Sequence, residues 1–199
     1  MKGTMIIPSD QDKWALFSGG LVVEVGTFIR NAHITGGVRF VGARMNGGLF
    51  MEGTTLVNPG RLALDAMNMV VEDAAEFSRG FTAYGTLRLR SGRYNGILSF
   101  SRAKLDSGDP ERMALHASHI QADELLLWPE EKIKGKVSLS YSRIELIMDH
   151  PSVWPDEIYL NGMTYDTLRG AEFKARLDWV SRDREFHLQP YEQLASWYH

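Results

Sequence analysis

A short pattern of apolar and polar positions recurs along the chain from about residue 37. It reads apolar, any, apolar, then two spacers, a small residue, any residue, a closing apolar residue and a turn. In one copy, Val38-Arg39-Phe40 leads to Ala43 and Met45, and Asn46-Gly47 supplies the turn. Other copies begin at Leu49, Leu62, Leu87, Leu98, Met113 and Val137. The spacing between the copies at 38 and 49, and between those at 87 and 98, is 11 residues.

Each apolar-any-apolar triplet predicts a very short strand whose alternate side chains point to one side. Asn-Gly pairs close turns through a positive φ, and the small residue allows the chain to bend. A single unit cannot bury its own apolar side, so two units per coil would have to stack into a continuous core. We therefore predict a mainly β protein, a right-handed parallel β-helix (β-solenoid) of about four to five coils.

The predicted solenoid covers residues 36–168 and follows an N-terminal cap with the first strands over residues 1–35. Residues 75–84 and 124–133 fit the unit poorly and are predicted to be loops or decorated coils. An antiparallel β-sandwich is the alternative fold, because its strands also recur every 8–12 residues or so.

Helical periodicity replaces the strand pattern after Leu168. Residues 171–180 place Phe173, Leu177 and Val180 on one helical face, and residues 189–198 predict a second helix with Pro190 in its first turn. Such helices would cap the unpaired edge of the last coil, so residues 169–199 are predicted to be a C-terminal helical segment, truncated in this sequence. Four tryptophans are expected to seal this end: Trp128, Trp154, Trp179 and Trp197.

Three segments carry a resemblance to a known family: Tyr159-Leu160-Asn161-Gly162-Met163-Thr164-Tyr165-Asp166-Thr167-Leu168, Trp179-Val180-Ser181-Arg182 and Gln189-Pro190-Tyr191-Glu192-Gln193-Leu194-Ala195. With the repeats, they resemble a group of bacterial β-solenoid proteins that are often labelled "membrane-associated oxidoreductase". In that family further helical sequence and a hydrophobic membrane segment commonly follow, and both would lie beyond His199. The resemblance implies the soluble head of a membrane-associated protein, in the cytoplasm or on the cytoplasmic side of the bacterial membrane. It brings no established catalytic residues with it.

The composition and the motif spacing argue against several kinds of chemistry. The chain has no cysteine, which excludes disulfides, thiol nucleophiles and Cys-ligated metals. Its net charge of -3 is not that of a nucleic-acid binder. The glycines do not form the Gly-x-Gly-x-x-Gly turn of a dinucleotide site. His116 and His119 would face opposite sides of a strand, so no metal site and no cofactor are expected.

Three carboxylates keep an enzymatic alternative open. Asp65, Asp106 and Asp149 could supply the acid and base of a β-helical carbohydrate-active enzyme if they were held close together. They stand at or near the ends of units, where aspartate is an ordinary turn residue. We therefore predict a non-enzymatic scaffold or binding module, with an oxidoreductase or a carbohydrate-active enzyme as the alternatives.

Positive charge is concentrated in residues 77–105, which contain no Asp or Glu but six basic residues: Arg79, Arg88, Arg90, Arg93, Arg102 and Lys104. Arg88 and Arg90 alternate with Leu87 and Leu89 and should point outward. We predict that Arg88, Arg90 and Arg93 form an anion-binding strip for an anionic membrane surface or a protein partner. The alternative is a solvated surface whose arginines pair with acidic side chains of neighbouring coils.

Overall fold

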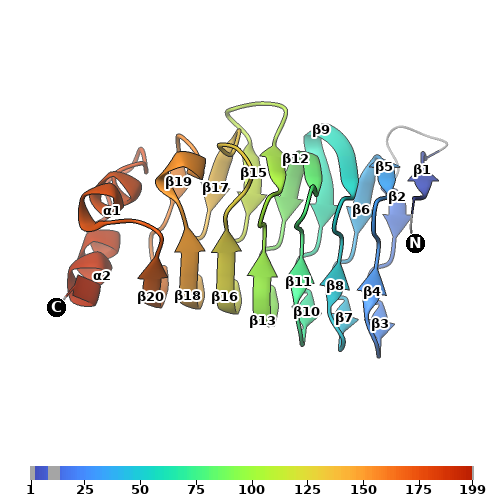
Figure 1. Cartoon of the computed structure of the whole chain (residues 1–199), viewed down its shortest axis with the longest axis horizontal. Coiled ribbons are helices and arrows are strands. Elements are labelled where there is room, and N and C mark those ends of the chain that lie inside the picture. Colours follow the sequence, from blue (N-terminus) through green and yellow to red (C-terminus); the bar gives the residue numbers. More distant parts are fainter. Residues whose placement is uncertain (1–2, 9–13, 199) are drawn as a thin grey trace.

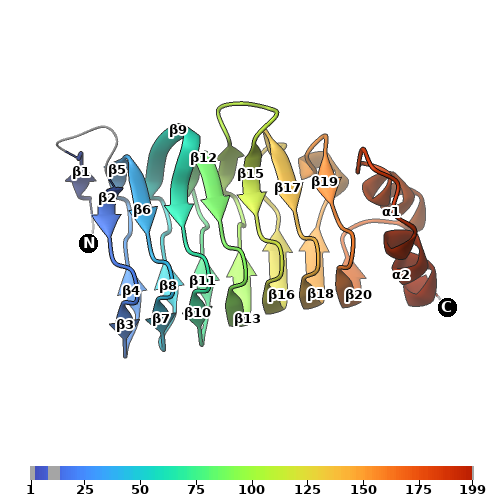
Figure 2. The ribbon, with the colours of Figure 1, turned by 180° about the vertical axis from the view of Figure 1, so that it is seen from behind.

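A stack of coils runs the length of the molecule, and two helices close its C-terminal end (Figures 1 and 2). The computed structural model describes residues 3–8 and 14–198, and the strands it shows pair only in parallel. The prediction of a parallel β-solenoid is confirmed, and the β-sandwich is excluded. Residues 1–2 and 9–13 of the predicted N-terminal cap, and His199, lie outside the described residues.

Two sheets form the long sides of the solenoid. In the described part of the chain the first sheet contains β1 (Met5–Ile6), β2 (Trp14–Phe17), β5 (His33–Thr35), β6 (Gly37–Arg39), β9 (Thr55–Asp65), β12 (Thr82–Arg88), β14 (Lys104–Asp106), β15 (Met113–His116), β17 (Lys136–Ser138) and β19 (Ile158–Tyr159). The second sheet contains β3 (Val22–Val23), β4 (Thr27–Phe28), β7 (Arg44–Met45), β8 (Leu49–Phe50), β10 (Val70–Val71), β11 (Ala75–Glu76), β13 (Arg93–Ser99), β16 (Gln121–Leu127), β18 (Arg143–Asp149) and β20 (Thr164–Arg169).

The solenoid has about seven turns, so the predicted four to five coils are too few. One row of paired positions in the second sheet marks the successive coils: Val22, Arg44, Val70, Arg93, Gln121, Arg143 and Thr164. Residues 75–84 and 124–133 contribute regular coil sides (β11, β12 and β16) rather than loops. The apolar pattern missed these coils because each carries one extra residue relative to the unit at Leu98. Ala75 and Ala83 pair with Leu98 and Leu105, and Leu125 and Lys134 pair with Leu98 and Asp106.

The core is built from ladders of identical inward positions. One ladder in the first sheet contains only fully buried aliphatic residues: Val38, Leu64, Leu87, Leu115, Val137 and Ile158. Burying one such side chain contributes roughly 1.5–3 kcal/mol, so the ladders supply the main stabilisation of the stack. Leu89, predicted to point inward, is also fully buried.

The same ladder corrects the register of two units. The units predicted to begin at Leu62 and Met113 begin two residues later, at Leu64 and Leu115. A shift of two residues leaves the alternation of inward and outward side chains unchanged. The apolar pattern alone therefore could not distinguish the two registers.

Each coil turns a corner through a residue with left-handed backbone at the second spacer position of the unit. One corner row has φ between 55° and 72° and contains Gly20, Gly42, Asn68, Ser91, His119, Tyr141 and Gly162. A second corner row contains Gly3, Asn31, Gly53, Arg79 and Arg102. This conformation is uncommon for residues other than glycine, so the corners are imposed by the hydrogen bonds between coils.

Two helices, α1 (Phe173–Val180) and α2 (Leu188–Tyr198), cover the last coil as predicted. A short 3-10 helix, η1 (Pro151–Val153), lies beside the cap. Trp154 and Trp179 are buried there with ring centroids 6.0 Å apart, and Arg176 of α1 pairs with Asp149 at the end of β18. Trp128 departs from the prediction for the tryptophans, because it lies at the end of β16 and is 40% exposed.

Candidate functional site

The three arginines of the predicted anion-binding strip lie around one corner of a single coil. Arg88 ends β12 in the first sheet, Arg90 follows it, and Arg93 begins β13 in the second sheet. The corner residue Ser91 separates Arg90 from Arg93. The strip therefore bends from one sheet to the other.

Arg88 is engaged by a buried carboxylate of the adjacent coil. Its Nε and one terminal nitrogen donate hydrogen bonds of 3.0 and 2.7 Å to Asp65, which also accepts a bond of 2.8 Å from Arg39. The Asp65 side chain is fully buried, whereas the two arginines remain about a third exposed. Arg39, Asp65 and Arg88 thus form a row of alternating charges across three coils of the first sheet.

Arg90 and Arg93 are exposed and make no ion pair with any residue in the ranges 3–8 and 14–198. Nearby arginines also affect the pKa of His116, which aligns with Arg88 across the first sheet. Burial lowers the pKa of His116, and the positive charges of Arg90 and Arg88 lower it further.

The carboxylates that an enzymatic interpretation would need are held apart. Asp65 belongs to the row described above, and Asp149 is buried in the cap, where it accepts hydrogen bonds from Arg176 and from the Trp154 indole. Asp106 accepts the backbone N–H of Gly108 at 2.8 Å. The three carboxylates therefore lie on different coils, and each is engaged by neighbours of its own.

The described residues contain neither a metal-binding cluster nor a helix that could span a membrane. No group of three or more His, Cys, Asp or Glu side chains within them could hold a metal ion. Likewise, none of the helices they form is long and apolar enough to cross a bilayer.

A surface pocket lies on the second sheet, and its origin lies in two rows of outward side chains. Row A consists of aligned positions on successive strands: Phe28, Phe50, Glu76, Ser99, Leu126 and Met148. Row B lies two residues further along each strand: Arg30, Glu52, Ser78, Ser101, Trp128 and His150. Large side chains fill both ends of the rows, whereas three serines occupy the middle.

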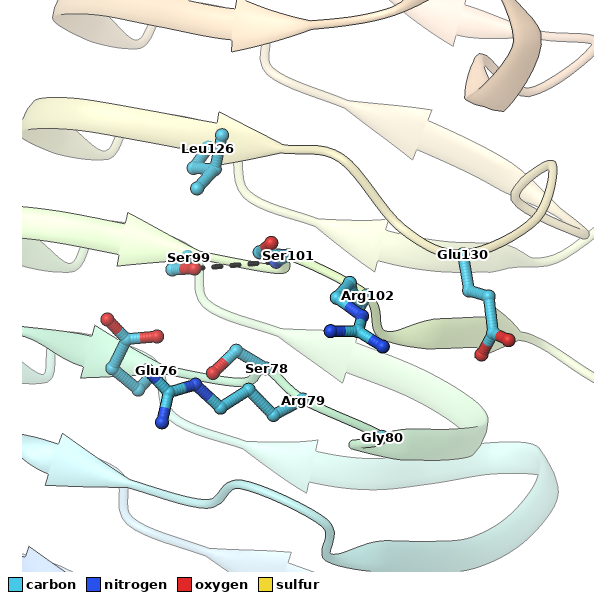
Figure 3. Close-up of a pocket in the computed structure, with 9 residues that line it drawn as sticks. All are labelled: Glu76, Ser78, Arg79, Gly80, Ser99, Ser101, Arg102, Leu126 and Glu130. Atoms are coloured by element: carbon cyan, nitrogen blue, oxygen red, sulfur yellow. Dashed lines mark hydrogen bonds between the residues drawn. The ribbon is translucent and has the colours of Figure 1, made fainter.

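The serines leave a depression of about 530 Å³ between the larger residues (Figure 3). Its serine lining consists of Ser78, Ser99 and Ser101, and the backbone N–H of Ser101 donates to the Ser99 hydroxyl at 3.4 Å. Leu126 lies on the next coil beside Ser99 and also lines the pocket, where it is the first large residue of row A after the serine. The volume is within the range of small-molecule sites.

Arg79 and Arg102 line the pocket from the second corner row, on adjacent coils. Their left-handed backbone is held by hydrogen bonds to the next coil, Arg79 N–H to Ser101 and Arg102 N–H to Trp128. Neither guanidinium forms an ion pair with a residue that the structure describes. Their free N–H groups are therefore available to a ligand.

Two carboxylates balance these arginines. Glu76 lies in row A and Glu130 faces Arg102 across the pocket (Figure 3). The Nζ of Lys104 lies 3.7 Å from Glu130, but both side chains are substantially exposed. The lining thus combines two cations, two anions and three hydroxyls, with equal numbers of positive and negative charges.

The sequence contained a signal for this pocket that the apolar pattern obscured. Its lining comes largely from residues 75–84 and 124–133, the stretches that fit the unit poorly, and from the basic window 77–105. Arg79 and Arg102 share the same place in the coil 23 residues apart, next to serines that are also aligned. Recognising this requires the register between coils, which depends on the length of each connection.

Comparison with family models, with curated proteins and with solved structures finds no match to this chain. The pocket and the rows of the solenoid therefore carry the functional argument alone.

Proposed function

We propose that this chain is a non-enzymatic binding module, in which the solenoid holds a small ligand in the serine–arginine pocket of the second sheet. The observation that carries the proposal is the local replacement of large outward side chains by Ser78, Ser99 and Ser101, beside two arginines without ion pairs. A depression lined by hydroxyl groups and by arginines without ion pairs is what a polar ligand requires.

The rigidity of the site supports binding. Ser99 ends strand β13, and Ser78 and Ser101 lie two residues beyond the ends of β11 and β13. The arginines lie at corners whose backbone is bonded to the next coil. Groups that are already in place lose little conformational entropy when a ligand arrives, which favours affinity. The backbone geometry also fixes the separation of the two arginine Cα atoms at the spacing of adjacent strands, about 4.8 Å.

A pocket-filling substitution tests this proposal. Ser101→Leu should fill the depression with a side chain like that of Leu126 in the neighbouring row. Ser140→Leu is the matched control, because both serines are half-buried and directly precede a left-handed corner residue. Thermal unfolding of the three proteins would be measured with a library of phosphorylated metabolites, nucleotides, amino acids and oligosaccharides.

We expect at least one compound to raise the Tm of the wild type and of Ser140→Leu, and to leave the Tm of Ser101→Leu unchanged. A ligand at 100 times its Kd stabilises the folded state by about 2.7 kcal/mol, which such a measurement detects readily. A library without effect on the wild type, or an equal shift in Ser101→Leu, would contradict the proposal.

A further inference from the structure

An aromatic ring stands beside the pocket in row B. Trp128 stacks on His150, with ring centroids 5.5 Å apart and an interplanar angle of 28°. Its neighbour on the other side of the row is Ser101, whose side chain is too small to cover an indole. This arrangement agrees with the 40% exposure of Trp128 and leaves an apolar surface next to the hydrogen-bonding groups of the pocket.

The charges of the pocket narrow the chemical class of its ligand. A phosphate or sulfate would gain hydrogen bonds from Arg79 and Arg102, but it would face the carboxylates of Glu76 and Glu130. Carboxylates only accept hydrogen bonds and guanidinium groups only donate them, whereas serine hydroxyls do both. A ligand that forms hydrogen bonds with the carboxylates, the guanidinium groups and the hydroxyls therefore needs groups that can both donate and accept.

Hydroxyl groups on a ring meet this requirement. Each sugar hydroxyl can donate to a carboxylate and accept from a guanidinium, and the C–H face of a sugar ring is apolar enough to stack on an indole. We infer that the pocket, together with Trp128, binds a saccharide. The inference rests on the proposed binding function and adds the class of ligand and an aromatic residue outside the pocket lining.

A matched pair of aromatic substitutions tests the inference. Trp128→Ala removes the ring beside the pocket, and Tyr141→Ala is the control, because Tyr141 also stacks on a histidine, His119, with centroids 5.1 Å apart. Binding would be screened on an array of neutral, amino and uronic oligosaccharides. The affinity of the strongest would then be measured by titration calorimetry for the wild type, both aromatic variants and Arg102→Gln.

We expect the wild type to bind at least one oligosaccharide. Trp128→Ala and Arg102→Gln should each weaken that binding about tenfold or more, and Tyr141→Ala should change it less than twofold. Equal losses in Trp128→Ala and Tyr141→Ala would overturn the role of Trp128. Circular dichroism would establish that each variant is folded, and Trp128→Phe, which keeps an aromatic surface, should recover part of the affinity.

Two other outcomes separate this inference from the proposed function. If no oligosaccharide binds but another compound produces a Tm shift that Ser101→Leu abolishes, the saccharide is wrong and the binding function stands. Inorganic phosphate and sulfate form a separate arm: saturable binding of either ion that Arg102→Gln abolishes, without any oligosaccharide binding, would identify an anion site instead. Failure of every probe would overturn both.

Discussion

Two arginines of the same basic window, Arg88 and Arg102, have opposite environments on the two sheets. In the first sheet Arg88 lies beside Asp65, a fully buried carboxylate of the adjacent coil. In the second sheet Arg102 lies at a corner beside small serines and without an ion pair among the described residues. The comparison shows that a run of positive charge along the sequence acquires its role only when the coils are stacked.

The difference follows from the neighbours that each coil receives. Asp65 aligns with both Arg39 and Arg88, so one carboxylate compensates two cations in the first sheet. In the second sheet the neighbours of Arg102 in its corner row are Arg79 and the chain beyond Trp128, where Glu130 lines the same pocket without forming an ion pair with Arg102. Arg88 is therefore held by an ion pair in the first sheet, whereas Arg102 forms none with the described residues of the second sheet.

Removal of the shared carboxylate should have the largest effect on stability. Asp65→Asn leaves two partly buried guanidinium groups without an anion, and we expect the free energy of unfolding to fall by about 3 kcal/mol. Urea denaturation measures this change directly. Asp106→Asn, at a more exposed carboxylate, should cost below about 1 kcal/mol. Similar costs for the two substitutions would remove the distinction between the two kinds of site.

Removal of one arginine at a time sharpens the comparison. Arg88→Gln loses two hydrogen bonds to a charged group and should lower the free energy of unfolding by about 2 kcal/mol. Arg102→Gln loses no ion pair and should change it by about 0.5 kcal/mol or less. Both values come from urea denaturation under identical conditions. A destabilisation by Arg102→Gln as large as that by Arg88→Gln would show that Arg102 is structural.

The exposed arginines outside the pocket define a third environment. If an anionic membrane is the partner, Arg90 and Arg93 should each contribute about 1 kcal/mol to binding at low salt. The double variant Arg90→Gln, Arg93→Gln should then bind phosphatidylserine vesicles about 30-fold more weakly in sedimentation assays. The variant Arg79→Gln, Arg102→Gln should bind nearly as well as the wild type, because these arginines lie in the second corner row, away from the corner at Ser91 that carries Arg90 and Arg93. No sedimentation of the wild type at low salt would exclude a membrane-binding strip.

Relief of backbone strain at the pocket should have the smallest effect. Arg102 has φ 56°, a conformation that glycine adopts at little cost. Arg102→Gly should therefore raise the free energy of unfolding by about 0.5 kcal/mol, after the greater entropy of glycine in the unfolded chain is included. Arg102→Ala, which keeps the strain, should show no gain. A loss of stability in Arg102→Gly would mean that the arginine side chain stabilises the fold.

Much of the fold could be predicted from the sequence because inward positions repeat in a pattern that every coil must satisfy. Leu87 and Leu89 were predicted to be inward because they form the apolar positions of a recurring unit and alternate with Arg88 and Arg90, and both are fully buried. Both terminal helices followed from apolar spacing after Leu168. The coil count was too low because residues 75–84 and 124–133, which each carry one extra residue between their paired positions, did not match the apolar unit.

The candidate site was less predictable because it depends on which coil lies beside which. The basic window was visible, but the engagement of Arg88 by Asp65 depends on a register over 23 residues that runs through β10, β11 and β12. The left-handed corners at Arg79 and Arg102 gave no sequence signal, because glycine is the usual residue in that conformation. Serines in the sequence predict a pocket only when the larger residues that lie beside them on adjacent coils are known.

The position of the pocket along the stack has a consequence for local unfolding. Each coil is stabilised only by the coils directly beside it, so opening should begin at an end and proceed inward. The first coil exposes Met5, Phe17 and Val25, whereas the last coil is covered by α1 and α2. Amide hydrogen exchange should therefore be fastest in the N-terminal coils. The coils that carry Arg79 and Arg102 lie well inside the stack and would keep the pocket formed while the N-terminal coils open and close.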